Sequence, residues 1–236
     1  MMRIDMNNSY LKVCAWGGPI FTVCFLVAFI LLAGFLPPPS PAASAEAIAE
    51  FYAEHSIGIR SACVLMMLGF SFAAPFYAAI TVRMRQMGNS SPALVATFAI
   101  ATAAITAVIF VVITAWAAAA FRVDRSAELI QAFNDFAFLL IIWPGSIISM
   151  SYFALGFATI SDNRAIPVFP RWFGFMNFWM GFMLYGGAIL LFFKTGPFAW
   201  DGLFAFWIPA VAFFGWYIVT SIVLIKSINR DRHLNE

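Results

Sequence analysis

The sequence predicts an all-α protein: a six-transmembrane-helix bundle, N-in/C-in, with a short outer amphipathic helix. Of its 236 residues, 63% are hydrophobic and 10% are charged, whereas a soluble domain has about 45–50% apolar and about 25% charged residues. The apolar residues form long charge-free runs, and one helical span needs about 20 of them. Barrel strands would be about 10 residues long with alternating polarity. The runs therefore indicate a helical integral membrane protein.

Six apolar runs of this length make up a single transmembrane domain over residues 1–236. Within the fourth run, Trp143-Pro144-Gly145 predicts a kink, because proline removes one backbone hydrogen bond and clashes with the preceding turn. Ser91 and Pro92 favour a helix start, as a cap and a first helical residue. We expect Asp201 to cap the sixth span. The predicted spans cover residues 13–36, 59–82, 93–121, 136–160, 172–193 and 202–225.

The first run has some features of a signal peptide, with a basic start and small residues at Ala43-Ser44-Ala45. However, the run is longer than the apolar region of a signal peptide, and Pro37-Pro38-Pro39 separates it from those small residues. We therefore expect an uncleaved first span.

Residues 44–55 predict the amphipathic helix, which would lie on the membrane surface or over the mouth of the bundle. Ser44 can cap it, and Glu46 falls in its first turn, where the helix dipole favours an anion. One face would carry Ile48, Phe51, Tyr52 and His55, and another would carry Glu46, Glu50 and Glu54. These acids make attraction to anionic lipid weak, which favours the outer side.

The distribution of charge predicts the orientation. With both termini inside, the inner segments hold about nine basic residues and the outer segments about four, as the positive-inside rule requires for short loops. Seven acidic residues fall in the outer segments, which include the predicted outer loop Arg122–Asp135: Glu46, Glu50, Glu54, Asp124, Glu128, Asp135 and Asp201. The inner basic residues are Arg3, Lys12, Arg83, Arg85, Arg164, Arg171, Lys226, Arg230 and Arg232. We expect a multi-pass protein of the cell membrane, namely the bacterial inner membrane.

The predicted inner loop after the fourth span contains Ile166-Pro167 and then Pro170-Arg171-Trp172-Phe173-Gly174. In these residues the chain resembles a bacterial family of six-helix integral membrane proteins catalogued only as a domain of unknown function. That family shows a similar Ile-Pro-Arg-Trp-Leu pattern, whereas here Val168 and Phe169 stand between the two prolines. The resemblance implies six spans and supplies no activity.

The sequence offers no motif for catalysis, for a metal or for a cofactor. Proton-driven pumps generally need ionisable groups in the span centres, and this chain has almost none there. Haem ligation would need axial histidines, but His55 and His233 are predicted on opposite sides. Cys14, Cys24 and Cys63 fit no metal or disulfide pattern, and no basic cluster suggests nucleic acid. We therefore expect no cofactor, no metal, no nucleic-acid partner and no catalytic residue, and an enzyme is the least favoured class.

The predicted kink in the fourth span is the first candidate site, because a broken helix exposes carbonyl groups and can line a cavity. Aromatic side chains with a few hydroxyls suit an apolar ligand such as a lipid, a sterol or an aromatic compound. The alternative is that the aromatic residues only fill the bundle while the hydroxyls bond to their own helices. The candidate residues are Trp143, Ser146, Ser149, Tyr152, Asn177, Trp179, Tyr185, Trp216 and Tyr217.

A polar cluster at the outer rim is the second candidate. Arg60 could pair with Asp135, either to hold a polar head group or as a structural ion pair at the bilayer edge. The cluster comprises His55, Arg60, Arg122, Asn134, Asp135 and Asp201.

Two function classes follow. The first is a protein that binds or carries a small apolar or lipid-like molecule in the bundle. The second is an accessory or assembly subunit of a larger membrane complex, with a membrane-protein partner or a second copy of the chain. For the second class, a stripe of small residues on the third span would let another helix approach closely. The stripe consists of Ala96, Ala99, Ala103 and Ala107. Membrane lipids are expected partners in both cases.

Overall fold

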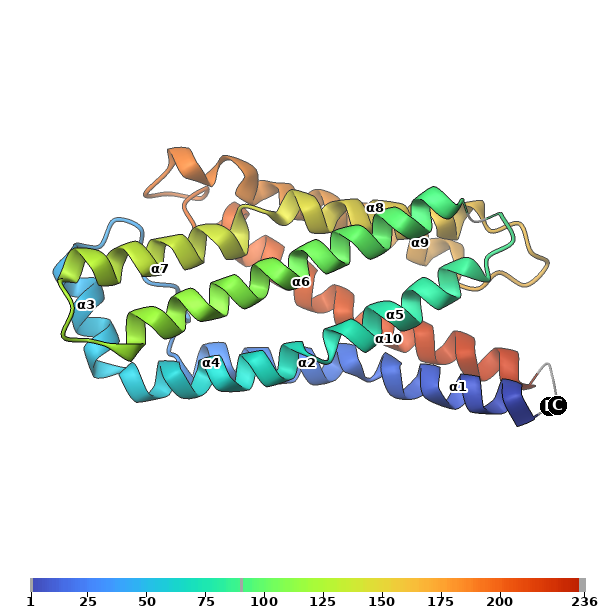
Figure 1. Ribbon diagram of the computed structural model, residues 1–236. Helices are drawn as coiled ribbons and strands as arrows, with labels where there is room; N and C mark the ends of the chain where they lie inside the picture. Colours follow the sequence, from blue (N-terminus) through green and yellow to red (C-terminus); the bar gives the residue numbers. More distant parts are fainter. Residues whose placement is uncertain (1, 90, 234–236) are drawn as a thin grey trace.

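The computed structural model describes residues 2–89 and 91–233, with side chains for residues 9–89 and 91–231. Every regular element in these ranges is a helix (Figure 1). Six stretches are long and apolar enough to cross a membrane, so the prediction of an all-α bundle of six spans is confirmed. Spans one to six are Ser9–Leu32, Ser56–Arg85, Pro92–Phe121, Ala127–Ser161, Arg171–Phe192 and Leu203–Asp231.

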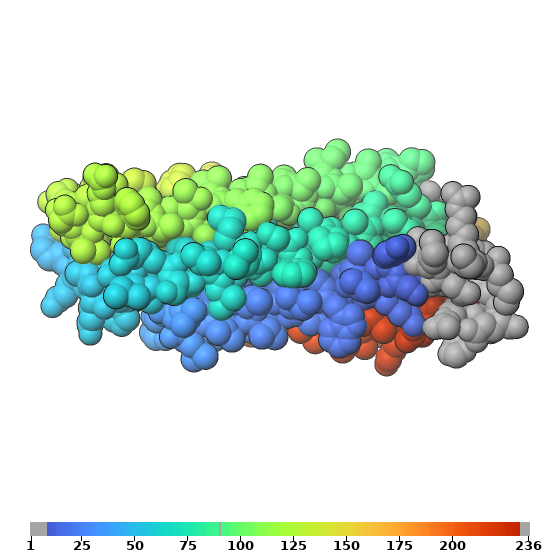
Figure 2. All heavy atoms as spheres, turned by 60° about the horizontal axis from the view of Figure 1, so that its bottom comes forward, coloured from blue at the N-terminus to red at the C-terminus, as the bar shows by residue number. Residues whose placement is uncertain are grey.

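Several spans are built from more than one helix. In the described residues the elements are α1 (Met2–Ala15), α2 (Gly17–Leu26), the π-helix η1 (Val27–Leu32), α3 (Ala45–Glu54), α4 (Ser56–Phe70), α5 (Ala73–Arg85), α6 (Pro92–Phe121), α7 (Ala127–Ile142), α8 (Gly145–Ser161), α9 (Arg171–Met183), the 3₁₀-helix η2 (Leu184–Phe192), the π-helix η3 (Leu203–Trp207) and α10 (Ile208–His233). Spans one to three run side by side along the length of the molecule (Figure 2).

The two ends of the bundle differ. One end, called here the terminal end, carries both chain termini and the α5–α6 and α8–α9 connections (Figure 1). The other, called the α3 end, carries α3 and the α6–α7 connection. The predicted orientation places the terminal end in the cytoplasm. The side chains of Arg3 and Arg232, which that orientation counts among the inner basic residues, lie outside the described residues.

Helix α3 agrees with the prediction. The Ser44 side chain accepts a hydrogen bond from the backbone N–H of Ala47 at 3.3 Å. Ile48 and Tyr52 are buried, while the three glutamates of the helix are exposed. The Ser91 cap is present too, since its Oγ accepts from the backbone N–H of Ala93 at 3.3 Å.

Two predicted details are wrong. The segment Arg122–Asp135 is a loop only at its start, because α7 begins at Ala127 and continues through Asp135. Its first turn holds Glu128, a favourable position for an anion near a helix N-terminus. Asp201 does not cap span six, because Gly202 occupies the capping position and no side-chain cap bond is made there.

Polar contacts tie the segments of the terminal end together. Arg83, of which 2% is exposed, forms a salt bridge of 2.7 Å with Asp231. Its guanidinium also donates to Gln86 Oε1 at 2.7 Å and to Ser227 Oγ at 3.2 Å. Arg230 donates to the carbonyl of Pro167 at 2.7 Å, so α10 holds both α5 and the α8–α9 connection in place.

Glycines allow α8 and α9 to cross closely. A Cβ built on Gly174 would lie 3.1 Å from the Gly156 carbonyl oxygen and 2.7 Å from Ile160 Cγ2. A Cβ on Gly156 would likewise lie 3.0 Å from the Gly174 carbonyl oxygen. This crossing therefore depends on the absence of side chains at both positions.

Candidate ligand-binding site

An apolar cavity of about 320 Å³ lies within the bundle. Its volume is at the lower end of the roughly 300–1,000 Å³ found for ligand pockets. All spans except span two contribute to its walls, and no wall residue carries a charge. The walls consist of Phe25, Leu26, Phe29, Ile30, Leu36, Ile105, Ile109, Ile141, Ile142, Gly145, Ile148, Leu184, Ala205, Phe206, Trp207, Pro209, Ala210, Val211, Phe213 and Phe214.

Regular α-helix geometry breaks down in four of the spans that surround the cavity. Phe29 and Ile30 come from the π-helix η1, and Phe206 comes from the π-helix η3. Gly145 begins α8 directly after the break in span four, where the sequence predicts the kink. Leu184 is the first residue of η2, where span five changes from an α-helix to a 3₁₀-helix. Such irregular turns within helices recur at functional sites.

Small residues let these irregular segments pack against one another. A Cβ on Gly145 would lie 2.8 Å from the Leu184 carbonyl oxygen, and one on Gly187 would lie 2.7 Å from Ile142 Cγ2. A Cβ on Gly186 would meet the Phe204 carbonyl oxygen. The break in span four, η2 and η3 are therefore in direct backbone contact, and together they frame one side of the cavity.

The most exposed wall residues of the cavity lie on spans one and six or just after span one. Val211 is 73% exposed, Trp207 40%, and Ile30 and Leu36 37% each. Deeper in, the Phe29 and Phe206 rings stack with centroids 6.2 Å apart. Val211, Trp207 and Ile30 belong to candidate membrane spans, so in a membrane this part of the wall would face lipid.

None of the nine residues predicted around the kink lines this cavity. Four of them are exposed on the surface of the bundle instead: Trp143 (49% exposed), Trp179 (68%), Tyr185 (37%) and Ser146. Proline and glycine alone were enough to predict the position of the kink. Which side chains point into the bundle depends instead on how each helix is rotated about its own axis.

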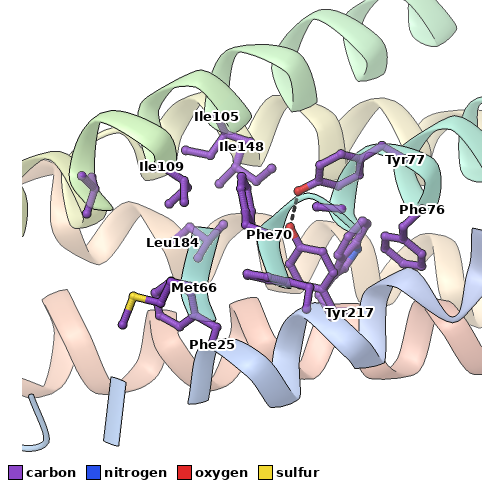
Figure 3. Close-up of a cluster of buried hydrophobic side chains, with 14 of the residues drawn as sticks. Phe25, Met66, Phe70, Phe76, Tyr77, Ile105, Ile109, Ile148, Leu184 and Tyr217 are labelled. Atoms are coloured by element: carbon purple, nitrogen blue, oxygen red, sulfur yellow. Dashed lines mark hydrogen bonds between the residues drawn. The ribbon is translucent and has the colours of Figure 1, made fainter. Parts of the chain in front are cut away.

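The other five predicted residues are buried, and four of them form an aromatic and polar cluster next to the cavity. Trp216 Nε1 donates to Asn177 Oδ1 at 2.8 Å, and the Tyr152 ring stacks on Trp216 with centroids 4.4 Å apart. The Tyr217 hydroxyl is hydrogen-bonded to that of Tyr77 (Figure 3). Ser149 bonds the carbonyl groups of Gly145 and Gly181 at 2.8 and 2.9 Å, which ties α8 to α9.

The predicted pairing of Arg60 with Asp135 is wrong. Arg60 Nε donates to the carbonyl of Ser56 at 3.2 Å, one turn back in its own helix. Asp135 accepts from Asn134 Nδ2 at 3.1 Å. No salt bridge among the described residues involves either side chain, because each residue bonds within its own helix.

The remaining residues of the outer cluster also make local contacts. The His55 ring stacks on Phe51 and its Nδ1 lies 3.0 Å from the Phe51 carbonyl oxygen. Arg122 is exposed, and Asp201 is half-buried. Asn134, which is fully buried, accepts a hydrogen bond of 3.2 Å from the Tyr52 hydroxyl. These contacts join α3 to α7 and do not form one site.

The chemistry of the cavity is that of a hydrocarbon solvent. In the described part of the chain, no group of three or more His, Cys, Asp or Glu side chains could hold a metal ion. The leucine, isoleucine and phenylalanine side chains of the walls leave a cavity dry and able to take up apolar molecules. The sequence alone does not identify Ile105, Ile109 or Phe206 as cavity residues. Isoleucine and phenylalanine are common both among the buried and among the exposed residues of this chain.

Comparisons of the chain with family models, with curated proteins and with solved structures gave no match.

Proposed function

We propose that this protein binds or carries a small apolar, lipid-like molecule, which reaches the cavity from the bilayer between spans one and six. One observation carries the proposal: an apolar cavity lies where four spans depart from α-helical geometry. Irregular helix turns leave backbone groups less well paired and are retained mainly where they shape a site. The basic residues at the terminal end support the N-in/C-in orientation, with this end in the cytoplasm.

Photolabelling tests this proposal. The full chain, reconstituted in lipid nanodiscs, is irradiated with a medium-chain alkane that carries a diazirine, and labelled peptides are identified by mass spectrometry. We expect labelling of the peptides that contain Phe29, Ile109 and Phe206, and we expect excess dodecane to suppress it. Labelling that dodecane does not suppress, or that follows only the exposed surface, would contradict the proposal.

A matched pair of variants sharpens the test. Ala205 lines the cavity and is fully buried, so Ala205→Phe fills part of the space and should abolish most of the suppressible labelling. Ala188 lies exposed on η2 in the same region of the bundle, so Ala188→Phe should leave the labelling unchanged.

An accessory or assembly subunit is the second candidate function. Its support is that Ala96, Ala99, Ala103 and Ala107 are all exposed on α6, so none of the described helices covers the stripe. Extraction in mild detergent followed by native mass spectrometry distinguishes a subunit of a larger complex from a protein that acts as a single chain. A complex that dissociates in Ala99→Leu supports an assembly role, and the mass of a single chain in the wild-type protein speaks against it.

A further inference from the structure

Three tyrosines from three spans meet beside the cavity, on its side toward the terminal end. Tyr152 lies one helical turn beyond the wall residue Ile148, and Tyr217 lies one turn beyond the wall residue Phe213. Tyr77 comes from α5 and is hydrogen-bonded to Tyr217. The Tyr152 ring stacks on Trp216 with centroids 4.4 Å apart, and Trp216 packs edge-on against Tyr217 with centroids 5.2 Å apart. The three rings are at least 95% buried.

Among the described residues, two O–H groups of this trio have no acceptor assigned to them. The Tyr77–Tyr217 bond uses one O–H group, so the other O–H group of the pair is free to donate. The Tyr152 hydroxyl is buried and has no hydrogen-bond partner among the described residues. Because it is costly to leave a buried polar group unpaired, two O–H groups at this place favour an acceptor oxygen between them.

Phe70 is connected to this trio through Phe21. In the projection of Figure 3, the Phe70 ring is drawn between the tyrosine pair and the wall residues Ile109 and Leu184. Phe21 touches both sides, with its ring 4.9 Å from Phe70 and 4.7 Å from Tyr217. Phe70 is the last residue of α4, directly before the break in span two.

We infer that the ligand of the cavity is a hydrocarbon with one carbonyl oxygen, whose chain fills the apolar cavity and whose oxygen accepts hydrogen bonds from Tyr152 and from the Tyr77–Tyr217 pair. A carbonyl oxygen has two lone pairs, which match the two free O–H groups. An ammonium or another group that only donates would leave both of them unpaired. This inference rests on the function proposed above and adds the chemical class of the ligand.

To test the inference, dodecane and 2-dodecanone are compared as competitors that suppress photolabelling of the full chain by the diazirine alkane. Their concentrations are expressed as mole fractions in the nanodisc lipid. The two compounds have the same chain length and differ in the carbonyl. We expect 2-dodecanone to compete about 3- to 10-fold more strongly than dodecane, the effect of about one neutral hydrogen bond.

Tyr152→Phe should remove most of this preference and leave competition by dodecane unchanged. Tyr185→Phe is the matched control, since Tyr185 is 37% exposed on η2 and lies outside the trio; it should keep the full preference. Equal competition by both compounds in the wild-type protein, or an unchanged preference in Tyr152→Phe, would overturn the inference and leave the proposed function intact. Labelling that neither compound suppresses would instead remove the proposed function.

Discussion

The half of the bundle around the cavity and the half toward the terminal end are built in different ways. Around the cavity, two π-helices, a 3₁₀-helix and the break between α7 and α8 leave space between apolar side chains. Toward the terminal end, regular α-helices cross closely at Gly156 and Gly174, and α10 is tied to α5 through Arg83. The difference indicates that the terminal half contributes more to stability, whereas the cavity half is packed less tightly and leaves room for the proposed ligand.

The largest effect should follow from removing the buried charge of the terminal half. Arg83→Met removes the 2.7 Å salt bridge from Arg83 to Asp231 and the hydrogen bond from Arg83 to Ser227. Arg230 still contacts Asp231 at 3.4 Å. We expect a loss of about 2–3 kcal/mol in the free energy of unfolding, because removal of one partner of a buried pair is costly. Unfolding in mixed micelles measures it. Arg85→Met is the control, because Arg85 is exposed. Equal stability of the two variants would mean that the terminal half is not the stable one.

A smaller loss should follow from adding one methyl group where α8 and α9 cross. Gly174→Ala places a Cβ 2.7 Å from Ile160 Cγ2, and we expect a loss of about 2 kcal/mol from overpacking. Gly215→Ala is the matched control on α10, where a Cβ has no neighbour within 4 Å. Since alanine favours a helix over glycine, that variant should be as stable as the wild type or more stable. The same unfolding measurement compares them, and similar losses in both would argue against close packing at the crossing.

Two tyrosine hydroxyls allow a finer comparison. The Tyr52 hydroxyl donates to the buried Asn134, so Tyr52→Phe should cost about 1 kcal/mol. The Tyr152 hydroxyl has no partner among the described residues, so Tyr152→Phe should leave the melting temperature unchanged or raise it. A loss in Tyr152→Phe as large as that in Tyr52→Phe would show that the Tyr152 hydroxyl is already paired, and it would weaken the inferred ligand class.

The smallest effect concerns the exposed N-terminus of α3. The backbone N–H group of Glu46 and then the Ser44 hydroxyl lower the pKa of the Glu46 carboxyl. A lowered pKa in the folded protein stabilises it above the pKa of the unfolded chain, and this contribution disappears as the pH falls through the folded value. We expect an NMR titration to give a pKa below the ordinary value, and Ser44→Ala to move it part of the way back. An unchanged pKa in that variant would exclude the serine as a cause.

Features that depend on neighbouring residues in the chain were predictable. The number of spans follows from the length of the apolar runs. The cap at Ser44, the helix start at Ser91 and the break at Pro144 follow from local backbone chemistry, since proline and capping side chains act within one turn. The break at Ser71–Phe72 and the π-helices η1 and η3 were not predicted. Their residues form ordinary apolar runs, and a shift from α to π geometry depends on the segments that pack against them.

Site residues were predicted only in part, because composition says which side chains suit a ligand and not which way they face. Tyr152, Asn177, Trp216 and Tyr217 do come together in the bundle, while Trp143 and Trp179 face outward. Arg60 and Asp135 were both placed near the outer rim, yet each bonds within its own helix. A rotation of a helix by one residue, about 100°, is enough to separate two such side chains.

By itself, the sequence determined that this protein is helical, that it crosses the membrane six times and that α3 lies apart from both termini, because the free energy of burying apolar residues in lipid depends on composition and length alone. Only the tertiary structure decided where the cavity lies, that five spans enclose it and that three tyrosines meet beside it. In lipid, apolar side chains gain nothing from facing inward rather than outward, so helix rotation follows from shape and hydrogen bonding between spans, which no single stretch of sequence encodes.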